Sequence, residues 1–201
     1  MTSRLESGLR RIRRDLDDLG VGWAVIGGLA VSARAEPRTT RDIDLAIAAP
    51  SDAEGEGLAA SLVRRGYRIR DEGVLENLAT GRLAALRLSP PGEPDEGVVV
   101  DLLFHSSGVE AELIDTAETI ELFAGVLVPV ARRGPLIALK LLAGRAQDIA
   151  DARSLLRAAS AGDVEETRET LELIRRRGCD RGRHLRDLLD RLLAGRGIEV
   201  M

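Results

Sequence analysis

Two aspartates separated by a single residue, Asp42 and Asp44, stand at the start of an otherwise apolar segment, 43–48. If that segment is a β-strand, both carboxylates lie on one face, because side chains two positions apart on a strand point the same way. Carboxylates this close repel each other, and proteins that keep such a pair usually neutralise it with a cation. Their hard oxygens suit Mg²⁺, which binds one or two carboxylates together with substrate phosphates. The pair therefore predicts a magnesium site.

A glycine pair, Gly27-Gly28, follows the apolar Ile26 and precedes the aspartate pair by thirteen residues. Glycine lets the backbone approach a ligand closely, and the free N–H groups at the start of a helix bind phosphate. Each feature is common alone, but their occurrence in this order, both with apolar neighbours, is rare. We therefore expect Gly27 and Gly28 to bind the phosphates of a nucleotide whose metal lies on the two aspartates.

A third carboxylate, Asp101, lies within the strongly apolar segment 98–104. An ionised aspartate in such a strand is costly unless it has a partner. If this strand lies beside 43–48, Asp101 completes a three-carboxylate site that could hold two metal ions about 4 Å apart. It could also act as general base for an attacking hydroxyl. The alternative is an aspartate that caps a turn at the end of the strand.

The periodicity of apolar residues predicts the elements that must position these side chains. The predicted strands cover residues 23–26, 43–48, 67–70, 83–88, 97–104, 118–122 and 126–130. The predicted helices cover residues 3–19, 27–35, 55–65, 109–116, 135–143, 145–160, 163–177 and 181–194. A loop rich in proline, glycine and acids, 89–96, joins two of the strands and favours a hairpin.

Strands and helices are thus interspersed up to residue 131, and only helices follow, which indicates an α+β fold. We expect an α+β lobe with a mixed β-sheet and flanking helices over residues 1–131, followed by a helical lobe over 132–201. A length of 201 residues suits two small lobes or one domain with a helical extension.

The composition is that of a folded protein, with 44% apolar and 31% charged residues and a net charge of only −4. Aromatic residues make up 2%, which argues against binding of single strands by base stacking. The single cysteine, Cys179, cannot form an internal disulfide, and the charged N-terminus lacks the features of a signal peptide. No apolar run is long enough to span a membrane. We expect a cytoplasmic protein without a membrane partner.

The motifs resemble those of the DNA polymerase β-type nucleotidyltransferase superfamily, in which Gly-Gly or Gly-Ser, a short helix and Asp-x-Asp on a strand follow one another. The Gly-Gly form and the string Arg-Thr-Thr-Arg-Asp-Ile-Asp at 38–44 are similar to the AbiEii/AbiGii toxin-like branch. Members of that branch act as toxins of type IV toxin–antitoxin modules, and some attach nucleotides to tRNA. The resemblance implies an NTP substrate, an RNA or tRNA acceptor and a cognate antitoxin.

The same branch has a later helical motif, a lysine, then an arginine followed by Asp-x-x-Asp, which Lys140, Arg145, Asp148 and Asp151 match. Lys140 is also the only lysine of the chain. If one helix runs through Gly144, positions 140, 144, 148 and 151 share a face. Lys140 and Arg145 could then contact the triphosphate, with Asp148 holding either of them. Gln147 stands where that branch usually has a lysine.

Several of these residues also have a plainer interpretation. Arg41 could bind phosphate or could neutralise Asp42. Asp148 and Asp151 could be partners in ion pairs on the helix surface, with Arg145 and Arg153. The arginine-rich segment 175–186 could face RNA or be a solvated helix face.

The function that fits best is Mg²⁺-dependent transfer of NMP from an NTP to an acceptor hydroxyl, with RNA or tRNA as the acceptor. Asp42, Asp44 and Asp101 would be the metal ligands and catalytic residues. One alternative is a small-molecule nucleotidyltransferase of the antibiotic-modifying kind, or one that modifies a protein. Another is a degenerate nucleotide-binding or antitoxin-type module without activity.

Overall fold

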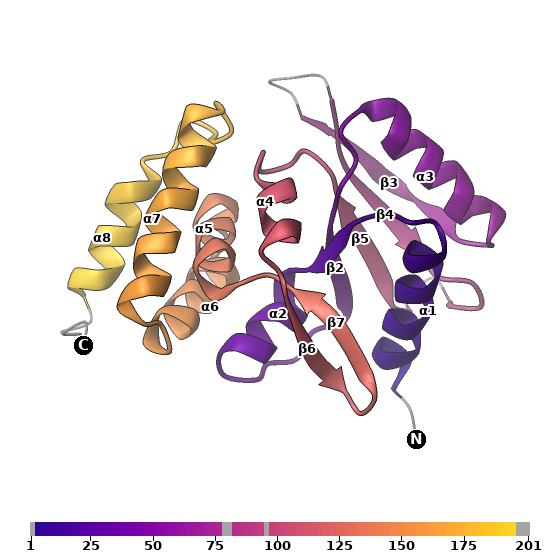
Figure 1. Ribbon diagram of the computed structural model, residues 1–201, viewed down its shortest axis with the longest axis horizontal. Helices are drawn as coiled ribbons and strands as arrows, with labels where there is room; N and C mark the ends of the chain where they lie inside the picture. The colour runs from indigo at the N-terminus through magenta and orange to yellow at the C-terminus, as the bar shows by residue number, and fades with distance from the viewer. Residues whose placement is uncertain (1–2, 78–81, 95–96, 196–201) are drawn as a thin grey trace.

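The computed structural model describes residues 3–77, 82–94 and 97–195 (Figure 1). In chain order the elements are α1 (Arg4–Asp18), β1 (Trp23–Val25), α2 (Gly27–Arg34), β2 (Asp42–Ile47), α3 (Asp52–Arg64), β3 (Arg68–Asn77), β4 (Arg82–Ser89), β5 (Val99–Leu103), α4 (Glu110–Asp115), β6 (Glu118–Phe123), β7 (Val126–Val130), α5 (Arg133–Ala143), α6 (Ala146–Arg157), α7 (Ala161–Arg176) and α8 (Leu185–Ala194).

The described strands form one mixed sheet of seven, in the order β3-β4-β5-β2-β1-β7-β6. β2 pairs parallel with β5 and antiparallel with β1, while β1 pairs parallel with β7. The remaining pairs are antiparallel, including the predicted hairpin of β4 and β5. The α+β class with a mixed sheet and flanking helices is therefore confirmed. The two segments that carry Asp42, Asp44 and Asp101 are direct neighbours at the centre of the sheet.

Helix boundaries differ from the prediction where local capping decides them. α3 begins at Asp52, three residues earlier than predicted, because Ser51 and Glu54 form a capping box that satisfies the first N–H groups. α8 begins at Leu185, four residues later than predicted, because Arg181 adopts a left-handed backbone conformation with φ 56°. β3 continues to Asn77, beyond the predicted 67–70.

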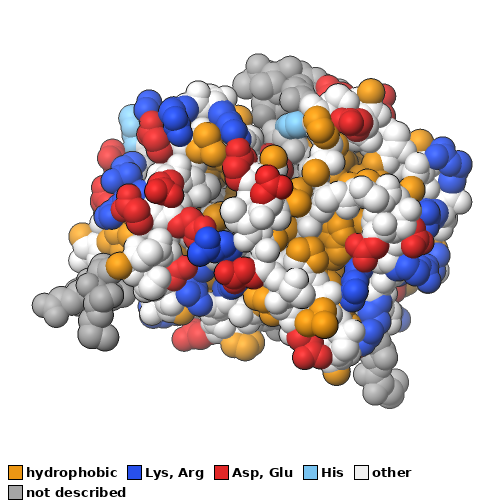
Figure 2. Space-filling view, in the orientation of Figure 1, with side chains coloured by type: hydrophobic (Ala, Val, Ile, Leu, Met, Phe, Trp, Pro, Cys, Tyr) orange, Lys and Arg blue, Asp and Glu red, His pale blue; other side chains and the backbone are white. Residues whose placement is uncertain are grey.

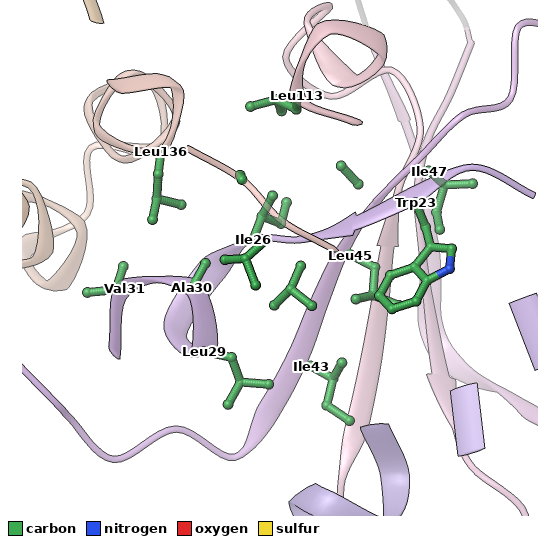
Figure 3. Close-up of a cluster of buried hydrophobic side chains, with 14 of the residues drawn as sticks. Trp23, Ile26, Leu29, Ala30, Val31, Ile43, Leu45, Ile47, Leu113 and Leu136 are labelled. Atoms are coloured by element: carbon green, nitrogen blue, oxygen red, sulfur yellow. The ribbon is translucent and has the colours of Figure 1, made fainter. Parts of the chain in front are cut away.

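The hydrophobic core lies between the sheet and the helices that cover it, and its buried side chains form one continuous cluster. Figure 3 shows its central part, where Trp23 and Ile47 of the β1–β2 pair lie near Leu45. Leu113 of α4 and Leu136 of α5 approach the same region (Figure 3). Because Ile43 and Leu45 are fully buried in this core, the alternating side chains of β2 point to the opposite face. That face carries the two aspartates.

α5 to α8 gather at one end of the molecule, whereas α1 and α3 lie at the other (Figure 1). α5 ends at Gly144, which has a left-handed backbone with φ 66°, and α6 begins two residues later. The idea of one helix running through Gly144 is therefore wrong, since a left-handed residue ends the helical hydrogen bonding. The division into lobes at residue 131 stays a prediction. Among the described residues no helix is long and apolar enough to cross a membrane.

Candidate active site

Three strands place the site in one row across the sheet. On β2 and β5, Asp44 lies directly opposite Asp101. On β4, Arg87 lies directly opposite Asp101. Directly paired residues share a face of the sheet, and Asp42 joins this face because it lies two positions before Asp44. The register thus brings together the three carboxylates predicted from the sequence and adds an arginine at the end of the row.

The turn from β1 to α2 lies over Asp44. Gly27 has a left-handed φ of 61°, and a Cβ on it would lie 1.9 Å from Asp44 Oδ2. Gly28 N–H points at the same oxygen at 3.4 Å, and a Cβ on Gly28 would lie 2.6 Å from Thr40 Oγ1. Ile26 caps α2 without a side-chain hydrogen bond, and the Asp44 carboxylate approaches the first turn of this helix through the Gly28 N–H. Both glycines are therefore required by close approach to neighbouring atoms.

We expect Gly27→Ala to abolish nucleotide transfer, because the added methyl group and Asp44 cannot occupy the same space. The left-handed backbone adds a cost of about 1–2 kcal/mol for a residue with a Cβ. The measurement is nucleotide incorporation, with a thermal melt of the same preparation. Gly57→Ala is the matched control, since Gly57 is exposed on α3 with no atom near its added Cβ. An active Gly27→Ala enzyme would contradict the close approach.

Asp44 is the carboxylate whose charge is least well accommodated. Its pKa is raised from 3.8 to about 6, mainly by burial and then by the charges of Asp101 and Asp42, against the opposing effects of Lys140 and the Gly28 N–H. A carboxylate in this position is destabilised when ionised and gains most from a cation. The electrostatics thus favour a metal ion at Asp44.

Asp101 is held by an ion pair that the sequence did not predict. Arg87 Nε donates to Asp101 Oδ1 at 2.8 Å, and Arg87 Nη2 donates to Oδ2 at 2.7 Å. The guanidinium keeps its charge firmly, since this hydrogen bonding to Asp101 raises the pKa of Arg87. The signal was present in the sequence, because an arginine in an apolar strand needs a partner as much as Asp101 does.

Within the described residues, no three His, Cys, Asp or Glu side chains are gathered closely enough to hold a metal ion. The donors nevertheless fit Mg²⁺ in kind, because all three are carboxylates on one face of neighbouring strands. The raised pKa of Asp44 means that a cation bound nearby would favour its ionised form. Both oxygens of Asp101 also accept a hydrogen bond from Arg87, so a cation that binds Asp101 would lie beside the guanidinium.

Lys140 lies beside the carboxylates, on the last turn of α5. Its ammonium is 3.1 Å from Asp148 Oδ1 and 3.0 Å from Asp151 Oδ2, and its side chain is only 9% exposed. Asp148 and Asp151 are themselves buried, so they do not lie on the helix surface as the plainer interpretation expected, although the ion pair between Asp148 and Arg145 is present. Two of the three N–H donors of the ammonium thus meet carboxylates, and Lys140 also lines the cleft described below.

Further contacts fix these two aspartates. Arg145 Nε donates to Asp148 at 2.6 Å, and Arg38 Nη2 donates to Asp151 at 2.9 Å. Gln147 donates to Asp151 at 3.0 Å, so its amide serves the network that surrounds Lys140. Burial alone would raise the pKa of both carboxyls, but these hydrogen bonds outweigh it and lower both pKa values. Both carboxyl groups are therefore ionised at neutral pH.

A cleft of about 560 Å³ connects these parts. It is lined by the glycine turn, the three carboxylates, and the adjoining ends of α5 and α6. Four exposed arginines also line it: Arg41, Arg87, Arg145 and Arg181. Arg181 comes from the connection between α7 and α8 and donates to the backbone oxygen of Ser106. The cleft is large enough for a nucleotide, and its rim is positively charged.

The arginine-rich segment 175–186 does not form a purely basic surface. Arg175 and Arg176 both pair with Glu172, and Arg177 pairs with Glu112. Figure 2 shows basic and acidic side chains interspersed over the helical end of the molecule. Much of this positive charge is therefore balanced locally, which favours the solvated helix face over an RNA-binding helix. Arg181, by contrast, lines the cleft.

A family model described as "Nucleotidyl transferase AbiEii toxin, Type IV TA system" matches residues 10–197. No curated protein matches the chain significantly.

Three solved structures have a similar fold over most of this chain. The solution structure of the antibiotic-resistance factor ANT(2″)-Ia is 20% identical, covers 88% of this chain and 94% of its own, and has a TM-score of 0.53. The crystal structure of ANT(2″)-Ia with adenylyl-2″-tobramycin is 21% identical, with 85% and 98% covered and a TM-score of 0.51. An antigenic nucleotidyltransferase-like protein from Paracoccidioides brasiliensis is 21% identical, with 95% and 93% covered and a TM-score of 0.50. These likenesses concern the fold.

Proposed function

The chain belongs to the AbiEii nucleotidyltransferase toxin family of type IV toxin–antitoxin systems, and from this premise we propose that it transfers NMP from an NTP to a hydroxyl of RNA. The resemblance expected from the sequence is thereby confirmed, and the chain is a nucleotidyltransferase enzyme. The proposal adds the acceptor, tRNA or another RNA, the requirement for Mg²⁺ and the roles of individual residues.

One observation carries the proposal, the row of carboxylates across β2 and β5. Asp44 faces Asp101 in register, Asp42 shares their face, and burial with mutual repulsion raises the pKa of Asp44 to about 6. Such a cluster is unfavourable by itself and becomes favourable with Mg²⁺ bound. When bound, Mg²⁺ stabilises the attacking hydroxyl and the leaving pyrophosphate.

The chain's own residues position the reactants. The N–H groups at the start of α2 face the phosphates, and Gly27 and Gly28 allow them to come close. Lys140 lies opposite with one N–H left for a phosphate oxygen. The acceptor oxygen attacks the α-phosphorus as the bond to the β-phosphate oxygen breaks and pyrophosphate leaves. Asp101 takes the hydroxyl proton.

The charges around the cleft support an anionic acceptor. Arg41, Arg145 and Arg181 are exposed on its rim, and the side chain of Arg145 is 79% exposed even while it contacts Asp148. Phosphate groups of RNA are attracted by such a rim, whereas a cationic aminoglycoside like the one bound in the ANT(2″)-Ia complex is repelled. RNA is therefore favoured over a cationic small molecule.

The family also gives the proposal its biological setting. A toxin of a type IV system acts with a cognate antitoxin, and both NTP and tRNA are available in the cytoplasm. We propose this chain as the toxin half of such a pair in that compartment.

The test is transfer of label from each α-labelled NTP, with Mg²⁺, to total tRNA, to a cell extract or to an aminoglycoside. The proposal expects label on RNA, and loss of that label in the Asp42→Ala/Asp44→Ala variant. A matched control is Asp187→Ala/Asp190→Ala, which removes two exposed acids of α8 that do not line the cleft.

Each outcome separates the candidate functions. Label on protein or on a small molecule, with none on RNA, would replace the RNA acceptor by one of these. No label on any acceptor, from a folded protein, would favour a degenerate nucleotide-binding module. Transfer that persists in EDTA would remove the metal from the proposal.

A further inference from the structure

The ion pair between Arg87 and Asp101 lies inside the metal site described above. Arg87, Asp101 and Asp44 are consecutive in one row across β4, β5 and β2. Both oxygens of Asp101 accept hydrogen bonds from the guanidinium, at 2.8 and 2.7 Å. A cation shared by Asp44 and Asp101 needs at least one of those oxygens. Each oxygen keeps a second lone pair that a cation could use, but the cation would then lie beside the positive charge of the guanidinium, so Arg87 and a divalent cation compete for the negative charge of one carboxylate.

The backbone cannot relieve this competition. β5 is hydrogen-bonded to β4 on one side and to β2 on the other, which fixes the main chain at Asp101. Only the two side chains can move. The Arg87 side chain is 48% exposed at the edge of the cleft, so it can turn into solvent without leaving a cavity. Lys140, which is 9% exposed between two carboxylates, has no such freedom.

We propose that Arg87 is a positioning residue of the metal site, which holds Asp101 while the cleft lacks a cation and releases it when a divalent cation binds. This inference rests on the metal site of the proposed function. Without a cation, the forked pair balances the charge of Asp101 with that of Arg87, and the three-carboxylate site assembles only when a cation replaces the guanidinium. After release, the guanidinium remains on the cleft rim, where it can face phosphate.

The test measures binding of Mn²⁺ without nucleotide, from the electron paramagnetic resonance signal of free Mn²⁺. We expect Arg87→Met to bind Mn²⁺ about fivefold more tightly than the wild type, the upper range for an ion pair this exposed. Arg87→Lys keeps the charge but cannot bond both oxygens at once, so it is expected to fall between the two. A thermal melt of each variant verifies that it is folded.

Two controls separate competition from a general charge effect. Arg181→Met removes one positive charge from the same rim without touching a carboxylate, and it reports the effect of charge alone. In the Asp101→Asn background the effect of Arg87→Met should shrink to that of Arg181→Met, because the contested carboxylate is gone.

The outcomes decide between this inference and the metal site itself. The role of Arg87 is overturned if Arg87→Met binds Mn²⁺ no more tightly than Arg181→Met does, or if Arg87→Lys binds Mn²⁺ as weakly as the wild type. Either result leaves the metal site unaffected. Mn²⁺ binding that Asp44→Asn does not weaken overturns the metal site, and the role of Arg87 with it. Tightening in both Arg87 variants that depends on Asp101 supports the inference.

Discussion

Asp44→Asn is expected to lower nucleotide transfer by roughly a thousandfold or more, while it makes the metal-free protein more stable. Activity falls because asparagine removes the negative charge at the centre of the carboxylate row. Stability rises because that charge is desolvated and faces Asp101 and Asp42. Single-turnover incorporation of labelled NMP measures the first effect, and thermal melting in EDTA measures the second.

The gain in stability should depend on pH in a defined way. The folded-state pKa of Asp44 is raised from 3.8 to about 6, so the folded protein binds this proton more tightly than the unfolded chain. The contribution of Asp44 to the free energy of unfolding of the wild type is fully present below about pH 4, and it is lost as the pH rises through about 6. Asparagine does not titrate. The variant should therefore exceed the wild type by on the order of 2 kcal/mol above pH 6, and by nothing below pH 4.

The control for this experiment is Asp190→Asn, which removes an exposed carboxylate 4.0 Å from Arg186 on α8. It should leave both transfer and the pH profile of stability unchanged. An Asp44→Asn protein that melts lower than the wild type at pH 8 would mean that Asp44 stabilises the fold. That result would contradict the interpretation that the charge of Asp44 is unfavourable without a bound cation.

Asp151→Ala is expected to destabilise the protein by about 3–5 kcal/mol, the largest effect on stability that the structure predicts. Asp151 is 2% exposed and pairs with both Lys140 and Arg38. Its removal leaves the buried ammonium of Lys140 with one carboxylate partner, Asp148, in place of two. Arg38 lies 113 residues away in the chain and loses its anchor on α6. The unfolding midpoint in a thermal melt should fall by roughly 10 °C.

Asp190→Ala serves as the matched deletion of an exposed aspartate, and its midpoint should stay close to that of the wild type. Lys140→Met/Asp151→Ala should recover part of the loss, because it removes the unpaired cation together with its partner. A drop of less than about 1 kcal/mol in Asp151→Ala would show that Asp148 alone suffices for Lys140.

Much of the site could be predicted from the sequence because its first parts are local. The two-residue repeat of a strand places Asp42 and Asp44 on one face, and the apolar neighbours Ile43 and Leu45 indicate that the other face is buried. The glycine pair marks the turn into α2 for an equally local reason, since only glycine fits the left-handed turn against Asp44. Most of the predicted helices and strands are present for the same reason.

Contacts between segments that are distant in the chain could be predicted only on the assumption that particular strands or helices lie next to each other. Asp101 was expected in the site if its strand lay beside β2, and the parallel pairing of β5 with β2 meets that condition. The shared face of Lys140 and Asp148 was predicted on a helix through Gly144, but the left-handed Gly144 ends α5 there. The lysine still reaches Asp148, because α6 turns back beside α5.

The sequence by itself therefore determined the glycine turn and the Asp42–Asp44 pair, because the backbone repeat of a few residues dictates both. Only the tertiary structure decided that Arg87 holds Asp101 and that Lys140 is buried between Asp148 and Asp151. Those contacts depend on strand register and on how helices pack, and no short stretch of sequence specifies either. The partner that each charge finds is a property of the assembled fold.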